Sequence, residues 1–183
     1  VEGGILAYKD MILKQKFELY RNFGISYGDT NDVDVVGINA KMTEFSAAMG
    51  LVNLPRIDGI IKRRKQLAEY YREVFDDISG ISTYPYEKSI EYNYAYFPVI
   101  IDEDKYGVNR DELWIELGKR NIGTRKLYDR LTCDFSYYRD KPYRKDVRFA
   151  TEMTKKCLDF PMYSSLTEED IDYIGEVLRE IIK

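Results

Sequence analysis

Histidine is absent from this sequence of 183 residues, and its absence excludes several kinds of active site. Without histidine the chain by itself can form no Ser-His-Asp triad, no HExxH zinc site and no histidine general base. Cysteine is scarce: Cys133 and Cys157 are too few for a disulfide framework and lack the spacing of metal ligands. We therefore expect two buried free thiols in a reducing compartment, and no metal site.

Long apolar segments are also missing. No run reaches the roughly 18 residues of a membrane-spanning helix, and the N-terminus lacks the pattern of a signal peptide, so a cytoplasmic protein with no membrane partner is expected. The formal net charge is −4 and the pI is about 5.1, which argues against general nucleic-acid binding. The remaining composition, 44% hydrophobic and 33% charged, is typical of a globular protein.

A long helical pattern divides the chain. Apolar side chains recur at helical spacing over residues 41–77, and Pro55 is expected to end, kink or restart that helix. We predict one unit at residues 1–54, a connecting helix at 55–77 and a second unit at 78–183. Strands and helices alternate along the chain, so the fold class is α/β or α+β.

The second unit is predicted to combine strands with capped helices. Residues 92–101 are aromatic and β-branched, which predicts a strand with Pro98 at an edge or a bulge. GTRKLY, residues 123–128, is a second short strand candidate, and a further helix is predicted through Cys157. Two capping pairs predict helix starts: Asn109 with Glu112, and Thr167 with Asp170.

Most general templates of chemistry are not found. The sequence contains no GxGxxG, no GxxxxGK[ST] and no CxxC. Its acidic residues are scattered, so pairing any two as a general acid and base would be arbitrary. The acidic run EED at 168–170 lies in a predicted first helical turn, where carboxylates complement the helix dipole, and this favours capping over metal binding.

Asn39 and Lys41 stand out in the stretch GINAKMTEFSAAMGL, residues 37–51. Asn39 lies just before the predicted helix start, where an N-cap asparagine is the simpler interpretation. A helix N-terminus with a nearby amide and lysine is also an anion site suited to phosphate. Arg125 is either a surface charge or a clamp for a substrate phosphate, and spacing leaves both readings open.

The run GINAKMTEFSAAMGLVNLPRIDGIIKRRKQLAEYYREVF resembles the motif of DegT-type (DegT/DnrJ/StrS) sugar aminotransferases. These are pyridoxal-phosphate enzymes that aminate keto sugars on nucleotides. The matching positions are Gly37, Asn39, Lys41, Met42, Glu44, Ala47, Ala48, Gly50 and Leu51. EGGILAYKD, NYAYFPV, NIGTRKLY and LDFPMYSSLTEEDIDYI resemble further segments of the family in the same order, so the resemblance covers nearly the whole chain.

The resemblance implies the C-terminal part of a type I pyridoxal-phosphate transferase fold, of the α/β class. Residues 1–54 would be the tail of the large cofactor-binding domain, and residues 78–183 the small C-terminal α/β domain. The chain begins VEGGILAY without methionine, which fits a piece of a longer protein, although trimming explains the same observation. The implied enzyme is a cytoplasmic homodimer of cell-surface polysaccharide biosynthesis, with a nucleotide-linked keto-deoxysugar as substrate and a donor such as glutamate.

The resemblance also assigns roles to single residues. Asn39 is expected to contact the cofactor phosphate of the partner subunit, and Lys41 to lie near the substrate. The segments that line the nucleotide-sugar site supply three more candidates: Tyr94, Arg125 and Tyr128. The Schiff-base lysine is expected upstream of Val1, so no catalytic residue is assigned here and the 183-residue chain alone is expected to be inactive.

The sequence departs from the family pattern after the second strand candidate. Leu127 and Tyr128 stand where many members have a histidine, and Asp129 and Arg130 where related members often have Tyr–Pro. These departures leave the identity of the sugar open. Two other functions are also open: a non-catalytic α/β binding or regulatory module, and a lysine-less sugar dehydratase of the same fold, whose histidine would lie outside this chain.

Overall fold

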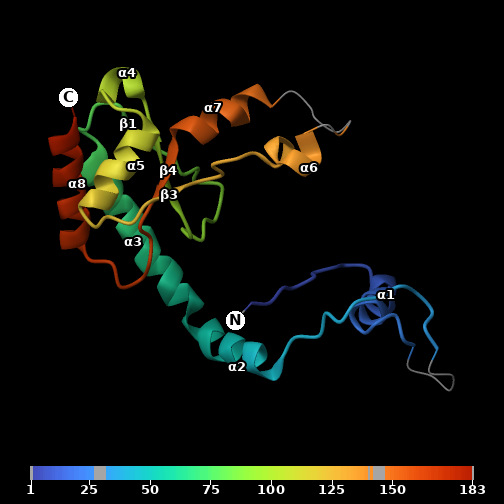
Figure 1. The fold of residues 1–183 in the computed structure, drawn as a ribbon. Helices are drawn as coiled ribbons and strands as arrows, with labels where there is room; N and C mark the ends of the chain where they lie inside the picture. Colours follow the sequence, from blue (N-terminus) through green and yellow to red (C-terminus); the bar gives the residue numbers. More distant parts are fainter. Residues whose placement is uncertain (1, 27–31, 140, 142–146, 183) are drawn as a thin grey trace. The chain divides into compact units, whose positions relative to one another are not determined.

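A computed structural model describes residues 2–26, 32–139, 141 and 147–182, and divides the chain into two units (Figure 1). Unit 1 is Val1–Ile57 and unit 2 is Asp58–Lys183. The division falls within the segment that the sequence predicts as a connecting helix, while the assignment of large and small domains stays a prediction. The two units are described separately below.

Unit 1 contains two short helices and a tight turn. Helix α1 spans Ile12–Arg21, α2 spans Glu44–Asn53, and the 3₁₀ turn η1 spans Leu54–Arg56. The long helix predicted over 41–77 is therefore interrupted, because Pro55 lies in η1 and the next helix, α3, runs separately over Ile57–Phe75.

Unit 1 has no buried hydrophobic side chain among residues 2–26 and 32–57. Several large apolar side chains are instead almost fully exposed, including Ile5 (92%), Val36 (94%) and Phe45 (85%). Unit 1 thus lacks a hydrophobic core of its own.

Unit 2 is built on a four-stranded antiparallel sheet. Strands β1 (Ile81–Thr83), β2 (Phe97–Ile101), β3 (Arg125–Lys126) and β4 (Cys157–Phe160) are ordered β1-β2-β4-β3. In the register between β2 and β4, Phe97 lies opposite Phe160, and in the register between β3 and β4, Arg125 lies opposite Asp159. Strand β4 therefore lies between β2 and β3, which come from the two segments that the sequence predicts as strands.

Two strand predictions need correction. The strand predicted over 92–101 begins only at Phe97, and β2 is central rather than at an edge; Pro98 is tolerated there because the pairing with β1 ends at Val99 and only β4 lies beside Pro98. The helix predicted through Cys157 ends one residue earlier, because residues 157–160 form the buried strand β4.

The helices of unit 2 pack around this sheet. They are α3, α4 (Glu103–Tyr106), α5 (Arg110–Lys119), α6 (Ser136–Arg139), α7 (Arg148–Lys156) and α8 (Glu168–Ile181), with a 3₁₀ turn η2 at Thr132–Asp134. Both predicted capping boxes are confirmed at the starts of α5 and α8. None of the helices within the described part of the chain is long and apolar enough to cross a membrane.

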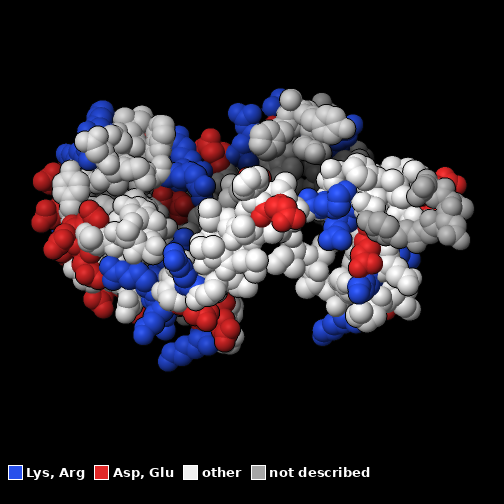
Figure 2. All heavy atoms as spheres, turned by 90° about the horizontal axis from the view of Figure 1, so that it is seen from below, with Lys and Arg blue, Asp and Glu red and all other residues white. Residues whose placement is uncertain are grey.

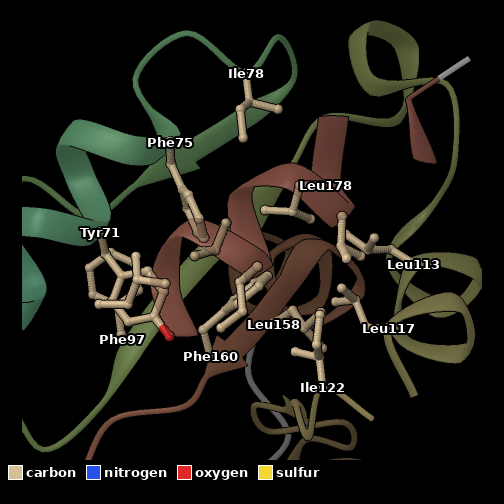
Figure 3. Packing of buried hydrophobic residues seen from close by; sticks show 14 of the residues in the cluster. Tyr71, Phe75, Ile78, Phe97, Leu113, Leu117, Ile122, Leu158, Phe160 and Leu178 are labelled. Atoms are coloured by element: carbon tan, nitrogen blue, oxygen red, sulfur yellow. The ribbon is translucent and has the colours of Figure 1, made fainter. Parts of the chain in front are cut away.

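A single hydrophobic core holds unit 2 together (Figure 3). Tyr71 from α3 stacks on Phe97 from β2 with ring centroids 4.5 Å apart, and its hydroxyl donates to the carbonyl oxygen of Pro161 at 3.1 Å. Leu113 and Leu117 from α5 and Leu178 from α8 lie in this core together with Leu158 from β4. Figure 2 shows Lys/Arg and Asp/Glu side chains both present on the visible face of the molecule.

Candidate functional site

The GINAK segment of unit 1 lies against the end of α1. Asn22 and Asn39 form an isolated antiparallel bridge, and the two backbones cross at a pair of glycines. A Cβ on Gly24 would lie 1.7 Å from the carbonyl oxygen of Val35, and a Cβ on Gly37 would lie 2.2 Å from the nitrogen of Gly24. Both distances fall far inside van der Waals contact, so this crossing needs glycine on both sides.

Asn39 is not a helix cap, which corrects the simpler interpretation from the sequence. The N-cap of α2 is Thr43, whose Oγ1 accepts from the backbone nitrogen of Ser46 at 3.2 Å. Asn39 lies five residues before the helix, with its backbone held beside Asn22. Its side chain is exposed and makes no hydrogen bond to any residue that the structure describes.

Lys41 is held by the same crossing. Its Nζ donates to Oδ1 of Asn22 at 3.0 Å and lies 4.2 Å from the ring centroid of Phe23. Both partners lie just after α1, and both interactions leave the ammonium group exposed. The helix-terminus argument for a phosphate site therefore fails for Asn39 and Lys41. The segment still presents an exposed amide and an exposed lysine beside the Asn22–Asn39 bridge.

A cavity of about 520 Å³ lies next to the segment in unit 1. Ile38 and Ala40 line it together with Tyr8, Tyr20 and Arg21. The residue between them, Asn39, is not among the residues that line the cavity. The exposed amide of Asn39 therefore does not face this cavity.

Arg125 occupies the start of β3 in unit 2. Its guanidinium NH2 donates to Oδ2 of Asp159 at 3.3 Å, and the guanidinium carbon lies 5.1 Å from the ring centroid of Tyr96. Asp159 is only 8% exposed, and its Oδ1 accepts from the backbone nitrogen of Phe97 at 2.9 Å. Burial raises the pKa of the Asp159 carboxyl above its ordinary value, against the opposing effects of that hydrogen bond and of Arg125.

Asp159 is not among the site residues that the sequence predicts. One signal was available, because an aspartate between Leu158 and Phe160 places a carboxylate inside an apolar strand. The contact between Arg125 and Tyr96 also brings together two predicted segments, since Tyr96 lies two residues after Tyr94.

Tyr94 belongs to a half-buried cluster of tyrosines. Its backbone has a positive φ of 51°, and its ring centroid lies 4.9 Å from that of Tyr86 and 6.0 Å from that of Tyr92. Arg72 lies 5.7 Å from the Tyr86 ring centroid, and burial raises the pKa of the Tyr86 hydroxyl to about 12. Packing therefore accounts for the position of Tyr94 without a ligand.

Tyr128 has the same backbone φ of 51° but different surroundings. Its side chain is 75% exposed and makes no hydrogen bond or ring contact within the described ranges. Tyr128 lies two residues after the end of β3, in the same segment as Arg125. Arg125 and Tyr128 are thus neighbours in unit 2, and Asn39 and Lys41 are neighbours in unit 1.

A buried arginine anchors the segment that carries Tyr128. Arg110, the first residue of α5, is 6% exposed; its NH1 donates to the carbonyl oxygen of Cys157 at 3.3 Å and its NH2 to Oδ1 of Asp129 at 3.2 Å. Lys126 lies 2.7 Å from Oδ1 of Asp111, and this interaction lowers the pKa of the Asp111 carboxyl. The sequence did not indicate the Arg110–Asp129 pair or the Lys126–Asp111 pair, since each joins residues far apart in the chain.

Comparison with protein families identifies the chain. Residues 1–179 match the model of the DegT/DnrJ/EryC1/StrS aminotransferase family. The chain belongs to this family. Its members are pyridoxal-phosphate-dependent aminotransferases, and the resemblance drawn from the GINAK run and the later segments is confirmed.

Two curated relatives carry the same name, dTDP-4-amino-4,6-dideoxy-D-glucose transaminase. The Escherichia coli protein is 35% identical over 179 residues, which are 97% of this chain and 47% of that protein. The Shigella dysenteriae protein is 34% identical over 181 residues, which are 98% of this chain and 48% of that protein. The chain thus spans about half the length of the curated relatives it matches.

Solved structures show the same fold. A structure of DesI in the presence of its TDP-sugar product aligns with a TM-score of 0.83 and 26% identity, over 93% of this chain and 43% of that one. Helicobacter pylori PseC, an aminotransferase involved in the biosynthesis of pseudoaminic acid, aligns with a TM-score of 0.82 and 20% identity, over 94% of this chain and 47% of that one. The predicted fold class, a part of the pyridoxal-phosphate α/β fold, is confirmed.

Proposed function

We propose that this chain is the C-terminal portion of a nucleotide-sugar aminotransferase. The complete enzyme would transfer an amino group, from a donor such as glutamate, to a nucleotide-linked keto-deoxysugar in cytoplasmic polysaccharide biosynthesis. The observation that carries the proposal is 35% identity, over 97% of the chain, to a transaminase whose name specifies a dTDP-linked 4-amino sugar. DesI, the structural relative at 26% identity, was also solved with a TDP-sugar.

The residues of the crossing fit the phosphate of pyridoxal phosphate. Asn39 presents an exposed amide without a partner among the described residues, on a backbone fixed by the crossing of Gly24 and Gly37. Such an amide can donate to a phosphate oxygen without first breaking a bond within its own subunit. We assign Asn39 to the cofactor phosphate of the partner subunit in a homodimer. When bound, the cofactor supplies the electron sink that amino-group transfer needs.

The substrate side is assigned to Arg125 and Tyr128, with Lys41 and Tyr94 as further contacts. Arg125 uses one nitrogen on Asp159, which leaves the rest of its exposed guanidinium for an anion. Guanidinium groups bind phosphate through paired hydrogen bonds, so a nucleotide diphosphate is a suitable ligand. Lys41 is an exposed lysine, and Tyr94 packs with Tyr86 and Tyr92 in a cluster two residues before Tyr96.

The Schiff-base lysine is proposed to lie before Val1 in the complete protein. The 183-residue chain alone is accordingly expected to show no transaminase turnover. A stand-alone binding module would bind a nucleotide sugar without converting it, and a lysine-less dehydratase would eliminate water rather than transfer nitrogen. The products of the complete enzyme distinguish these possibilities.

The test uses the complete reading frame that contains this chain. The protein is incubated with dTDP-4-amino-4,6-dideoxy-D-glucose and a 2-oxo acid, and nitrogen transfer is followed together with the visible absorbance of bound pyridoxal phosphate. We expect both signals, and we expect Asn39→Ala to weaken cofactor retention while the melting temperature of the apo-protein stays unchanged. A reading frame without a lysine shortly before Val1, or equal cofactor affinity in Asn39→Ala and wild type, would contradict the assignments.

A further inference from the structure

Tyr128 has a left-handed backbone and an exposed side chain, and neither is expected of a tyrosine that serves only to pack the fold. Its φ of 51° lies in the left-handed region, which bulky residues rarely adopt. Its side chain is also 75% exposed, so no packing offsets the strain. Tyr94 has the same φ, but its ring packs on Tyr86. Glycine or asparagine would satisfy the turn at residue 128 at lower cost, so the turn does not explain the tyrosine.

The residues on either side of Tyr128 are tied to one helix. Before it, Lys126 pairs with Asp111 at 2.7 Å and lies 4.6 Å from the ring centroid of Trp114. After it, Asp129 pairs with Arg110 at 3.2 Å. Every one of these partners lies in α5. The segment is therefore fixed at both ends, and the strained residue lies between the two fixed points.

The ion pair between Asp129 and Arg110 is well fixed, because Arg110 is buried and bound to other groups as well. Arg110 is 6% exposed, and its Nε and NH1 are engaged by Asp111 at 2.7 Å and by the carbonyl oxygen of Cys157 in β4 at 3.3 Å. Asp129 is itself exposed, so its carboxylate needs no burial to make the pair.

We propose that Tyr128 is a preorganised aromatic contact for the nucleotide sugar, and that Asp129, through Arg110, is the residue that positions it. The inference rests on the proposed function, which supplies the ligand. Strained conformations concentrate at ligand sites, where the surrounding structure maintains them. Because the residues on either side of Tyr128 are held before the ligand arrives, binding has to order less of this segment, and the exposed ring stays open for a sugar or base ring.

The test compares four variants of the complete enzyme with wild type. Tyr128→Asn removes the ring but suits the left-handed turn, and Asp129→Ala releases the second anchor. The third variant combines both changes. Asp77→Ala is the matched control, because Asp77 is an exposed aspartate in an ion pair with Arg179 at 2.6 Å, between α8 and the residues that follow α3. The measurements are kcat, KM for dTDP-4-amino-4,6-dideoxy-D-glucose, and melting temperature.

We expect Tyr128→Asn to raise this KM about five- to tenfold, as loss of an aromatic contact implies, with kcat nearly unchanged and no fall in melting temperature. Asp129→Ala should raise KM in the same direction, the double variant should match Tyr128→Asn, and Asp77→Ala should leave KM as in wild type. The inference is overturned if Asp129→Ala behaves like Asp77→Ala, if the two effects multiply, or if Tyr128→Asn lowers the melting temperature.

Failure of the proposed function has a different signature. If wild type binds pyridoxal phosphate but converts no amino sugar, the same proteins are titrated with dTDP in a calorimeter. Equal weakening of dTDP binding in Tyr128→Asn and Asp129→Ala would then support the positioning role although the proposed reaction has failed. Wild-type affinity in either variant, or no dTDP binding by wild type, would overturn both the contact and its positioning.

Discussion

Gly37→Ala tests whether the backbone crossing in unit 1 positions Asn39. The added Cβ would lie 2.2 Å from the nitrogen of Gly24, whereas ordinary contacts begin at 3.4 Å, so the two backbones must separate by about 1.2 Å. The neighbouring atoms are all backbone, so no flexible side chain can move aside. Asn39 follows two residues later and shifts with the segment. Displacements of about 1 Å at a positioning group can cost on the order of 100-fold.

The assay for Gly37→Ala is pyridoxal-phosphate affinity of the complete enzyme, measured by equilibrium titration of the apo-protein. We expect affinity to fall about 10- to 100-fold. The matched control is Gly118→Ala in α5, where nothing lies within 4 Å of the added methyl group. Alanine is the better helix former, so this control should gain up to about 1 kcal/mol of stability and keep wild-type affinity. If Gly37→Ala binds the cofactor as tightly as wild type, the crossing does not position Asn39.

Three further predictions concern unit 2, and urea unfolding measures each of them. Because the pKa of Asp159 is raised in the folded state, its carboxyl opposes folding above that pKa, and the opposition disappears as the pH falls through it towards the ordinary value. Asp159→Asn should thus be at least as stable as wild type near pH 7, with an advantage that shrinks towards about pH 4; a growing advantage contradicts the burial argument. Tyr71→Phe should lower the free energy of unfolding by about 1 kcal/mol, because the Pro161 carbonyl loses its buried donor; no change would mean that water replaces it. Asn109→Ala should also cost about 1 kcal/mol, through the loss of its hydrogen bonds to the nitrogens of Asp111 and Glu112, and an unchanged midpoint would contradict the cap.

Local interactions made some features predictable from the sequence. The capping boxes at Asn109 and Thr167 each join residues three apart, so the local sequence pattern was enough to predict them. The break at Pro55 is similarly local, because proline removes a backbone donor wherever it stands. The error at Asn39 has a related origin: Thr43 is also a good cap, and only the antiparallel bridge to Asn22 shows that Asn39 lies outside the helix.

Non-local interactions set the rest of the candidate site. Strand β4 has only four residues and directly follows α7, so its sequence shows no clear alternation of apolar and polar residues. It is a strand because it pairs with β2 on one side and β3 on the other. Asp159 gains its role from Phe97 and Arg125, which lie 62 and 34 residues away. Arg110 reaches Cys157 across 47 residues. The family resemblance pointed to Arg125 and Tyr128, but it could not show which residues hold them in place.

The contrast between the two units has a consequence for the order in which the chain acquires structure. The ribosome makes residues 1–57 before residues 58–183, yet the core described here lies entirely within residues 67–181, around Tyr71, Phe97 and Leu178. Unit 2 can therefore bury apolar surface as soon as it is complete, whereas the described residues of unit 1 bury no hydrophobic side chain on their own. We expect amide protons of β2 and β4 to be the last to exchange with solvent and those of α2 among the first. The segment that carries Asn39 would thus acquire its final form late, at the step that assembles the complete enzyme.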